Sequence, residues 1–222
     1  MILIGMFDSP YVRRVAVSMR LLEVPFEHRN WSAYRDFELI RQFNPLGRVP
    51  ALVQADGEAL IDSNAILDFL DDAAGPERAL LPPSGDERRR ALHIISLALG
   101  AADKGLVVLD ETLFRPQAKS YEPRIDRSRN QMHGALAEID RLAQLQAGEW
   151  MIAGRMTQAD ITLTCVFGFL CDALQLGQSW VLYPVLTALS ARCEGLPAFR
   201  ELRAKFTPNK SALSPEHDRA AR

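Results

Sequence analysis

The chain reads NPLGRVPALV from Asn44 to Val53, a stretch that contains both a chain reversal and the start of a strand. Residues 44–47 form a helix-breaking cluster, and residues 49–53 have the apolar, β-branched composition of a buried strand. Proline cannot donate to a sheet ladder, so Pro50 leaves one backbone edge open. A cis bond before Pro50 would turn the N–H and C=O of Val49 outward, where they could bind an extended peptide. An ordinary trans proline on an edge strand is the alternative.

The segments on both sides of this stretch alternate between strand and helix patterns. Before it, the sequence predicts a strand at residues 2–4, a helix that starts at Ser9-Pro10, a strand at 26–28 and a short helix within 31–43. After it, Asp56-Gly57 is a hairpin turn signal between strands, and a helix follows at 63–73. This order predicts a small α/β domain over residues 1–76 with a right-handed first crossover.

Strand signals end at a segment rich in Pro and Gly, residues 75–85, whose composition is typical of a linker between domains. The chain beyond it predicts an all-helical domain over residues 86–206, with helices at 86–115, 122–147, 157–174, 183–193 and 197–206. The third of these opens with a capping box, Thr157 to Asp160, which predicts where that helix starts. We expect the tail, residues 207–222, to be loosely ordered.

The composition excludes several classes of protein. With 222 residues, 48% of them hydrophobic, and a net charge of −2, the chain is globular, needs no disulfide or metal to fold, and lacks the basic footprint of a nucleic-acid binder. Three cysteines without a CxxC pair indicate reduced thiols and a cytoplasmic location, and four histidines show no metal-ligand spacing. The N-terminus lacks signal-peptide features, and the longest apolar stretch, residues 161–170, falls short of the roughly 20 residues that span a bilayer.

Two polar positions at helix starts carry possible chemistry. Ser9 stands where the unpaired N–H groups and the positive dipole end of a helix favour an anion, and its hydroxyl could donate to a bound thiolate. The alternative is that Ser9 only caps the helix. Asp62-Ser63 could hold the ammonium and carboxylate of a ligand, or one of the two could cap the helix that follows.

Together these segments resemble the glutathione transferase family. The matching motifs are Ser9-Pro10-Tyr11-Val12-Arg13, the stretch from Asn44 to Leu52, and Asp62-Ser63-Asn64-Ala65-Ile66, and the capping box in the helical half agrees with them. The resemblance covers residues 1 to about 206. It implies a thioredoxin-like N-terminal domain joined to an all-α C-terminal domain, glutathione as co-substrate without a metal, and a homodimer.

The resemblance also implies roles for individual residues. Ser9 would hydrogen-bond the glutathione sulfur and favour its thiolate, while Val49, beside a cis-Pro50, would pair with the cysteinyl backbone. The γ-glutamyl end would lie at Asp62 and Ser63, and Arg48 could reach the glycyl carboxylate. Tyr11 has two possible roles, because it could line the second-substrate pocket or compete with Ser9 for the sulfur.

The second-substrate pocket should be built by the helix at 86–115 and the loop near Tyr11. Its candidate lining residues are His93, Leu97, Leu99, Lys104 and Phe114, although for His93 we expect a partly buried packing role before an acid–base one. We expect Trp150, Phe167 and Phe169 in the core. Helical spacing alone does not say which face of the helix looks into the pocket.

Position 9 is Ser and not Cys, so the protein has no sulfur nucleophile there for mixed-disulfide chemistry. The resemblance therefore predicts a transferase in which glutathione itself attacks a small electrophile, a reaction of detoxification. A glutathione-dependent disulfide reductase or peroxidase on the same fold is one alternative. A non-catalytic interaction module is another. The partners expected are glutathione and a small electrophilic or disulfide substrate, with no nucleic acid and no membrane.

Overall fold

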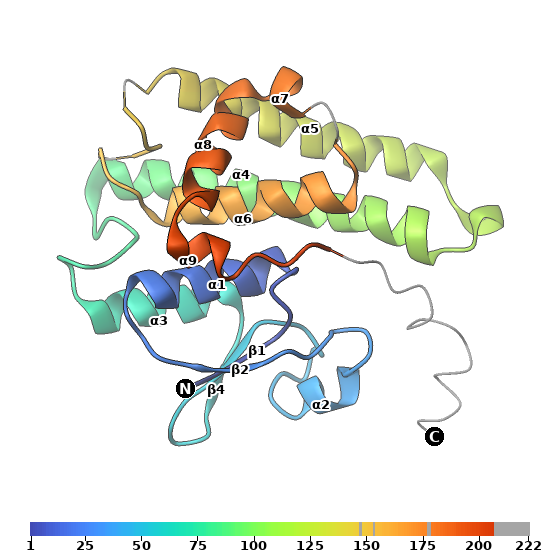
Figure 1. Ribbon diagram of the computed structural model, residues 1–222. Coiled ribbons are helices and arrows are strands. Elements are labelled where there is room, and N and C mark those ends of the chain that lie inside the picture. Colours follow the sequence, from blue (N-terminus) through green and yellow to red (C-terminus); the bar gives the residue numbers. More distant parts are fainter. Residues whose placement is uncertain (147, 153, 177–178, 207–222) are drawn as a thin grey trace.

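The computed structural model describes residues 1–206 except 147, 153 and 177–178, so the tail predicted at 207–222 lies outside the described residues. Figure 1 shows a small sheet at one end of the molecule and long helices stacked at the other, with α1 (Pro10–Leu21) and α3 (Ser63–Ala74) between them. The prediction of an α/β N-terminal part followed by an all-α part is confirmed.

The sheet has four short strands in the order β2-β1-β3-β4. Their bounds are Ile2–Ile4 for β1, Glu27–Arg29 for β2, Ala51–Val53 for β3 and Ala59–Leu60 for β4. β1 pairs parallel with β2 and antiparallel with β3, and β3 and β4 form the hairpin at Asp56-Gly57. All four strands overlap the predicted segments.

Alternating side chains of the strands serve two separate cores, as expected where a sheet is covered on both faces. Leu3 and Leu52 join the large core that includes α1, α3 and the helical part. Ile4 and Ala51 point to the other face, where they pack with Ile40 of α2 (Phe37–Arg41). Because β1 is buried on both faces, it reads as a continuous apolar run in the sequence.

The first two helices of the helical part match the predicted segments closely, and the end of this part is more broken than the sequence predicts. Its helices are α4 (Gly85–Leu109), α5 (Glu122–Gln144), α6 (Gln158–Ala173), α7 (Ser179–Leu182), α8 (Pro184–Glu194) and α9 (Pro197–Arg200), with a π-helical segment at Asp110–Phe114 and a 3-10 turn at Gln117–Lys119. The prediction of one helix over 197–206 is wrong, because α9 ends after one turn. The four-residue helix α7 lies between two predicted helices and was not itself predicted.

One continuous helix, Gly85–Phe114, is long and apolar enough to cross a membrane by length and composition alone. A buried core helix passes the same test. Here Ile94, Ala98 and Ala101 are buried, and α4 packs along both α5 and α6. At Gly105 a Cβ atom would lie 2.3 Å from Leu170 Cδ2, so the glycine allows α4 and α6 to approach closely. The helix is therefore accounted for as the central helix of the helical part.

The predicted capping box is present at the start of α6. The fully buried Asp160 carboxylate accepts from the Thr157 N–H at 2.8 Å and from the Thr157 hydroxyl at 3.0 Å. It also accepts from the Met151 N–H at 2.9 Å, which the sequence did not predict. The box thus holds both the helix start and the loop before it.

Candidate functional site

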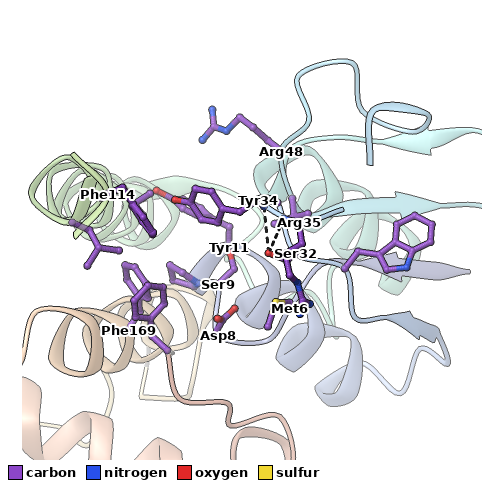
Figure 2. A pocket seen from close by; sticks show the side chains of 17 residues that line it. Met6, Asp8, Ser9, Tyr11, Ser32, Tyr34, Arg35, Arg48, Phe114 and Phe169 are labelled. Carbon is purple, nitrogen blue, oxygen red and sulfur yellow. Dashed lines mark hydrogen bonds between the residues drawn. The ribbon is translucent and has the colours of Figure 1, made fainter. Parts of the chain in front are cut away.

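A cleft of about 620 Å³ opens between the sheet end of the molecule and the helical part. The start of α1, the loop at residues 31–35 and the segment Arg48-Val49 form one side of it, as Figure 2 shows. Leu106 and Leu109 of α4, Phe114 of the π-helical segment and Phe169 of α6 form the other side. The cleft therefore brings together residues that are far apart in the sequence.

Glycine at position 5 lets three segments converge at this cleft. Gly5 has φ +130°, and a Cβ built there would lie 2.5 Å from Val12 Cγ2 of α1 and 2.8 Å from Val49 Cβ. A side chain at this position would push α1 and the Val49 segment apart, and the positive φ itself favours glycine. The end of β1 thereby sets how closely the two segments approach each other.

Ser9 occupies the N-cap position of α1 with extended backbone angles, φ −71° and ψ 124°, and Pro10 is the first helical residue. Its side chain makes no capping hydrogen bond, and its hydroxyl has no hydrogen-bond partner among the described residues. Ser9 lines the cleft. Of the two possibilities left by the sequence, the capping one does not describe this side chain, and the hydroxyl is free to donate to a ligand.

Val49 and Arg48 line the same cleft, and the Val49-Pro50 peptide bond is cis. Neither the N–H nor the C=O of Val49 is hydrogen-bonded to another described residue. The buried Asn44 side chain holds the loop before them, since its Nδ2 donates to the Arg48 carbonyl at 2.8 Å and its Oδ1 accepts from the Leu46 N–H at 3.0 Å. A free backbone donor and acceptor thus face the cleft beside an exposed guanidinium.

Tyr11 also lines the cleft, but its hydroxyl is already engaged. It donates to Asp103 Oδ1 of α4, a residue the sequence analysis did not single out. Burial first, then the hydrogen bond and charge of Asp103, raise the pKa of Tyr11 well above its usual value. The proton of Tyr11 therefore points to Asp103, which leaves Ser9 as the unengaged hydroxyl of the pair.

Asp62 and Ser63 lie at the start of α3 and do not line the cleft. Asp62 caps this helix, since its Oδ1 accepts from the Asn64 N–H at 2.7 Å. The fully buried Arg14 donates to Asn64 Oδ1 and, at 3.2 Å, to Thr162 Oγ1 of α6. Burial lowers the pKa of Arg14 to about 10, although the charge of Asp62 partly opposes this. Arg14 thus ties the start of α3 to α1 and α6.

The second-substrate candidates divide into two groups. Tyr11 and Phe114 line the cleft, whereas His93, Leu97, Leu99 and Lys104 do not. His93 is exposed, and Leu97 and Leu99 pack against the large core. The cleft meets α4 near its C-terminal end, through Leu106 and Leu109. His93, Leu97 and Leu99 lie about two or more turns earlier, and Lys104 lies on a different face of the helix from Leu106.

Several cleft residues were missed or assigned elsewhere by the sequence analysis. Phe169, expected only in the core, is nearly buried and also lines the cleft, where it meets Phe206 edge to face at 5.7 Å. Tyr34 reaches across from the loop and stacks at a tilt on Phe114, 5.1 Å between ring centroids. The weak periodicity of residues 31–43 gave no signal for this contact. Asp8 belongs to no recognisable motif of its own, and only the neighbouring Ser9-Pro10 motif indicated a site there.

Within the described residues, no group of three or more His, Cys, Asp or Glu side chains is arranged to hold a metal ion. The buried thiols of Cys165 and Cys193 have pKa values raised by burial to about 12 and about 11, so neither is an activated nucleophile. The chemistry available in the cleft is that of hydroxyls, free backbone groups and charged side chains.

Comparisons with known proteins agree with this geometry. Residues 3–78 match the family model for the N-terminal domain of glutathione S-transferase. An uncharacterised GST-like protein, YibF, of Escherichia coli K12 is 32% identical over 168 residues, 76% of this chain and 81% of that protein.

Two solved structures are also similar. A glutathione S-transferase of Methylobacterium radiotolerans in complex with glutathione sulfonate is 29% identical with a TM-score of 0.85, over 94% of this chain and 98% of that one. A glutathione S-transferase of Methylobacillus flagellatus with glutathione bound is 25% identical with a TM-score of 0.84, over 90% and 98%.

Proposed function

Because this chain belongs to the glutathione transferase family, we propose that it binds glutathione in the cleft beside Ser9 and promotes attack of the glutathione thiolate on a small electrophile. The observation that carries the proposal is the unengaged Ser9 hydroxyl at the N-terminus of a twelve-residue helix, in a cleft that also exposes the free backbone of Val49. Glutathione sulfonate bound to one of the two similar structures and glutathione bound to the other support the choice of co-substrate.

Ser9 acts by stabilising the thiolate form of the substrate. A thiol with a pKa of about 8.5 is mostly protonated at pH 7, and a hydroxyl donor at the positive end of a helix dipole lowers that pKa. The proton leaves to solvent, the sulfur forms a bond to the electrophilic carbon, and the leaving group departs with its electron pair. The gain in rate is smaller than the gain in thiolate, because nucleophilicity falls along with the pKa.

The remaining contacts hold the peptide. In the proposed pose the N–H and C=O of Val49 pair with the cysteinyl backbone, as an added strand pairs with a sheet edge. Arg48 reaches the glycyl carboxylate, and Asp62 with Ser63 receives the γ-glutamyl end. The second oxygen of Asp62 is left for this contact, since its capping bond to Asn64 uses Oδ1. Positioning of the two reactants then contributes to the rate beyond the effect of the pKa.

The proposal extends to the molecule as a whole. The two domains comprise residues 1–76 and 86–206, and the second substrate lies between the aromatic residues of the helical side and the loop at 31–35. The protein acts as a homodimer in the cytoplasm, in the detoxification of small electrophiles. These assignments rest on membership of the family and on the position of the cleft.

Titration of reduced glutathione into the pure protein tests the proposal, with heat and thiolate ultraviolet absorbance followed together near neutral pH. We expect binding and a thiolate signal. Ser9→Ala should keep most of the affinity and lose most of the thiolate. The matched control is Ser32→Ala, which removes a hydroxyl from the same cleft that only accepts from the Tyr34 and Arg35 N–H groups at 3.3 and 3.4 Å (Figure 2).

Three outcomes would count against the proposal. No binding at millimolar glutathione would favour the non-catalytic interaction module. Binding with an unchanged thiolate signal in Ser9→Ala would remove Ser9 from its role. Activity on glutathionyl disulfides without conjugation of aryl halides would assign a disulfide reductase instead.

A further inference from the structure

The cleft contains one carboxylate, that of Asp8, that has no role in the proposed chemistry. Asp8 directly precedes Ser9, and its side chain lies in the cleft close to Ser9 in Figure 2. No Lys or Arg of the described ranges forms an ion pair with it, and no arginine contributes to the electrostatics of its carboxyl group. A partly buried acid without a counterion is unusual enough to need a reason.

Three charged side chains line the cleft, Asp8, Arg35 and Arg48, and of these Arg35 pairs with Asp36 at 3.9 Å. Figure 2 shows Arg48 and Tyr11 on one side of Ser9 and Asp8 on the other. The Arg48 end is the one assigned above to the carboxylate of glutathione. The Asp8 end lies toward Phe169, on the side left for the second substrate. A second substrate on that side of Ser9 would therefore lie beside the negative charge of Asp8.

Two aromatic pairs line the cleft: the pair with Phe169 lies toward Asp8, and the pair of Tyr34 and Phe114 lies on the Arg48 side of Ser9 in Figure 2. Phe169 and Phe206 pack edge to face, and Tyr34 stacks on Phe114. Aromatic faces attract cations, and the attraction grows where water is excluded. Burial, followed by the charges of Asp110 and Asp8, raises the pKa of Tyr34, so its hydroxyl stays protonated and adds no charge of its own. Carboxylate and ring faces thus favour the same kind of ligand.

We propose that Asp8 is a specificity-determining residue that selects electrophiles carrying a cationic group and rejects those carrying a carboxylate. The inference rests on the proposed function, because it concerns the second substrate of that same cleft. Asp8 takes no part in forming or breaking a bond. It acts on the substrate by charge, through an attraction that is strong only where the site is partly shielded from water.

A purely structural role for Asp8 is the competing explanation. Its carboxylate lies near the N–H groups of Ser9 and of Asp8 itself, which favour the charged form, while burial is the larger effect and raises its pKa. If Asp8 only orients the start of α1, Asp8→Asn should change the free energy of unfolding or the affinity for glutathione. It should then change kcat/KM for all electrophiles by the same factor.

The test uses three ortho-nitro aryl chlorides that differ only in the group para to the chlorine: an amidinium, a carboxamide or a carboxylate. For each, kcat/KM is measured with the wild type and with Asp8→Asn, and the ratio of the two cancels the intrinsic reactivity of the compound. We expect Asp8→Asn to lose about tenfold with the amidinium compound, to gain about tenfold with the carboxylate and to change little with the carboxamide. Asp8→Glu should retain the wild-type preference. The matched control is Asp72→Asn, which removes an exposed carboxylate of α3 away from the cleft.

Equal ratios for the three compounds, with conjugation intact, would overturn the role of Asp8 and leave the proposed function standing. Absence of conjugation with all three compounds in the wild type would overturn both. If Asp8→Asn is poorly folded by its thermal transition, Asp8→Ser is the second variant, and the same ratios decide the result.

Discussion

At the scale of single residues, Ser9 and Tyr11 differ in what their hydroxyls already do. The two lie two positions apart and both line the cleft, yet only Tyr11 has a partner, the Asp103 carboxylate. A hydroxyl that donates to a carboxylate has no second proton to offer to a sulfur. Which of the two hydroxyls is engaged therefore depends on Asp103, a residue of α4 in the helical part of the protein.

This arrangement predicts how the reaction depends on pH. Because the pKa of Tyr11 is raised, its hydroxyl stays protonated through the neutral range. At saturating glutathione, the rise with pH of kcat/KM for the electrophile should therefore report the bound glutathione thiol and not Tyr11. We expect Tyr11→Phe to leave the midpoint of that rise in place. Ser9→Ala should move the midpoint up toward about 8.5, the value of a free thiol. A midpoint that moves upward in Tyr11→Phe would transfer the role to Tyr11.

The site positions of single residues were predictable from the sequence where the residue belongs to a short local motif. Ser9 beside Pro10, and Val49 before Pro50, stand at positions that short-range rules single out. Asp103 was not predictable, because an acid on an exposed helix face is ordinary until the fold brings a tyrosine from residue 11 to it. His93 failed for the same reason, since only the fold shows which part of α4 lines the cleft.

At the scale of elements, the start of α6 depends on Asp160. Its carboxylate accepts two backbone N–H groups and one hydroxyl while fully buried. Asp160→Ala removes the acceptor of these three buried donors, at about 1–3 kcal/mol each, so we expect a loss of at least about 3 kcal/mol in the free energy of unfolding. Chemical denaturation measures it. Asp160→Asn keeps one acceptor and should lose less. A stable Asp160→Ala protein without activity would contradict the folding role.

A second element contact joins α1 to the end of α8. Arg13 is 2% exposed and donates to both carboxylate oxygens of Glu194, at 2.7 and 2.6 Å, and to the Phe199 and Leu202 carbonyls. Removing one member of a buried pair leaves an uncompensated charge. We expect Glu194→Gln to lower the free energy of unfolding by about 3 kcal/mol.

The control for this contact is an exposed pair of the same kind. Arg41 and Glu38 lie 3.2 Å apart on α2, each more than half exposed, so Glu38→Gln should cost less than about 1 kcal/mol. Equal losses in the two variants, measured by the same denaturation, would show that the Arg13 pair contributes no more than a surface pair.

The starts of several helices were predictable from periodicity and capping motifs, but the residue at which a helix ends was not always predictable. α1, α3 and α6 begin at the residues that the Ser-Pro, Asp-Ser and Thr-Gln-Ala-Asp motifs predicted. The sequence from 197 onward has apolar residues at helical spacing, yet α9 stops at Arg200, where the chain turns to satisfy Arg13 through the Leu202 carbonyl. That contact is tertiary, and no local pattern contains it.

At the scale of the whole molecule, the two halves share one core. Val15 and Met19 of α1 belong to the same buried cluster as Leu163 and Val166 of α6. Polar contacts cross the same boundary, among them Ser18 Oγ to Gln158 Oε1 at 2.9 Å and the Gln158 N–H to the Leu80 carbonyl at 2.8 Å. Such a shared core predicts a single cooperative unfolding transition.

The same sharing predicts that residues 1–84 do not fold alone. Without α6, one face of α1 would expose its apolar side chains, and the charged Arg13 and Arg14 would lose their partners from the helical part. We expect the fragment to lack a cooperative transition and dispersed amide resonances, whereas the full chain has both. A fragment that unfolds cooperatively would mean that the α/β part is an independent domain.

Ser9 holds its position through backbone geometry alone, and this has a consequence for how the protein can change over generations. A side chain that adds nothing to the stability of α1 can be exchanged at little cost in folding, because Pro10 and the extended backbone already define the helix start. Reactivity at this position is thus free to drift while the scaffold stays the same. A laboratory selection that randomises position 9 should return folded proteins with nearly every small side chain, differing in chemistry and not in yield.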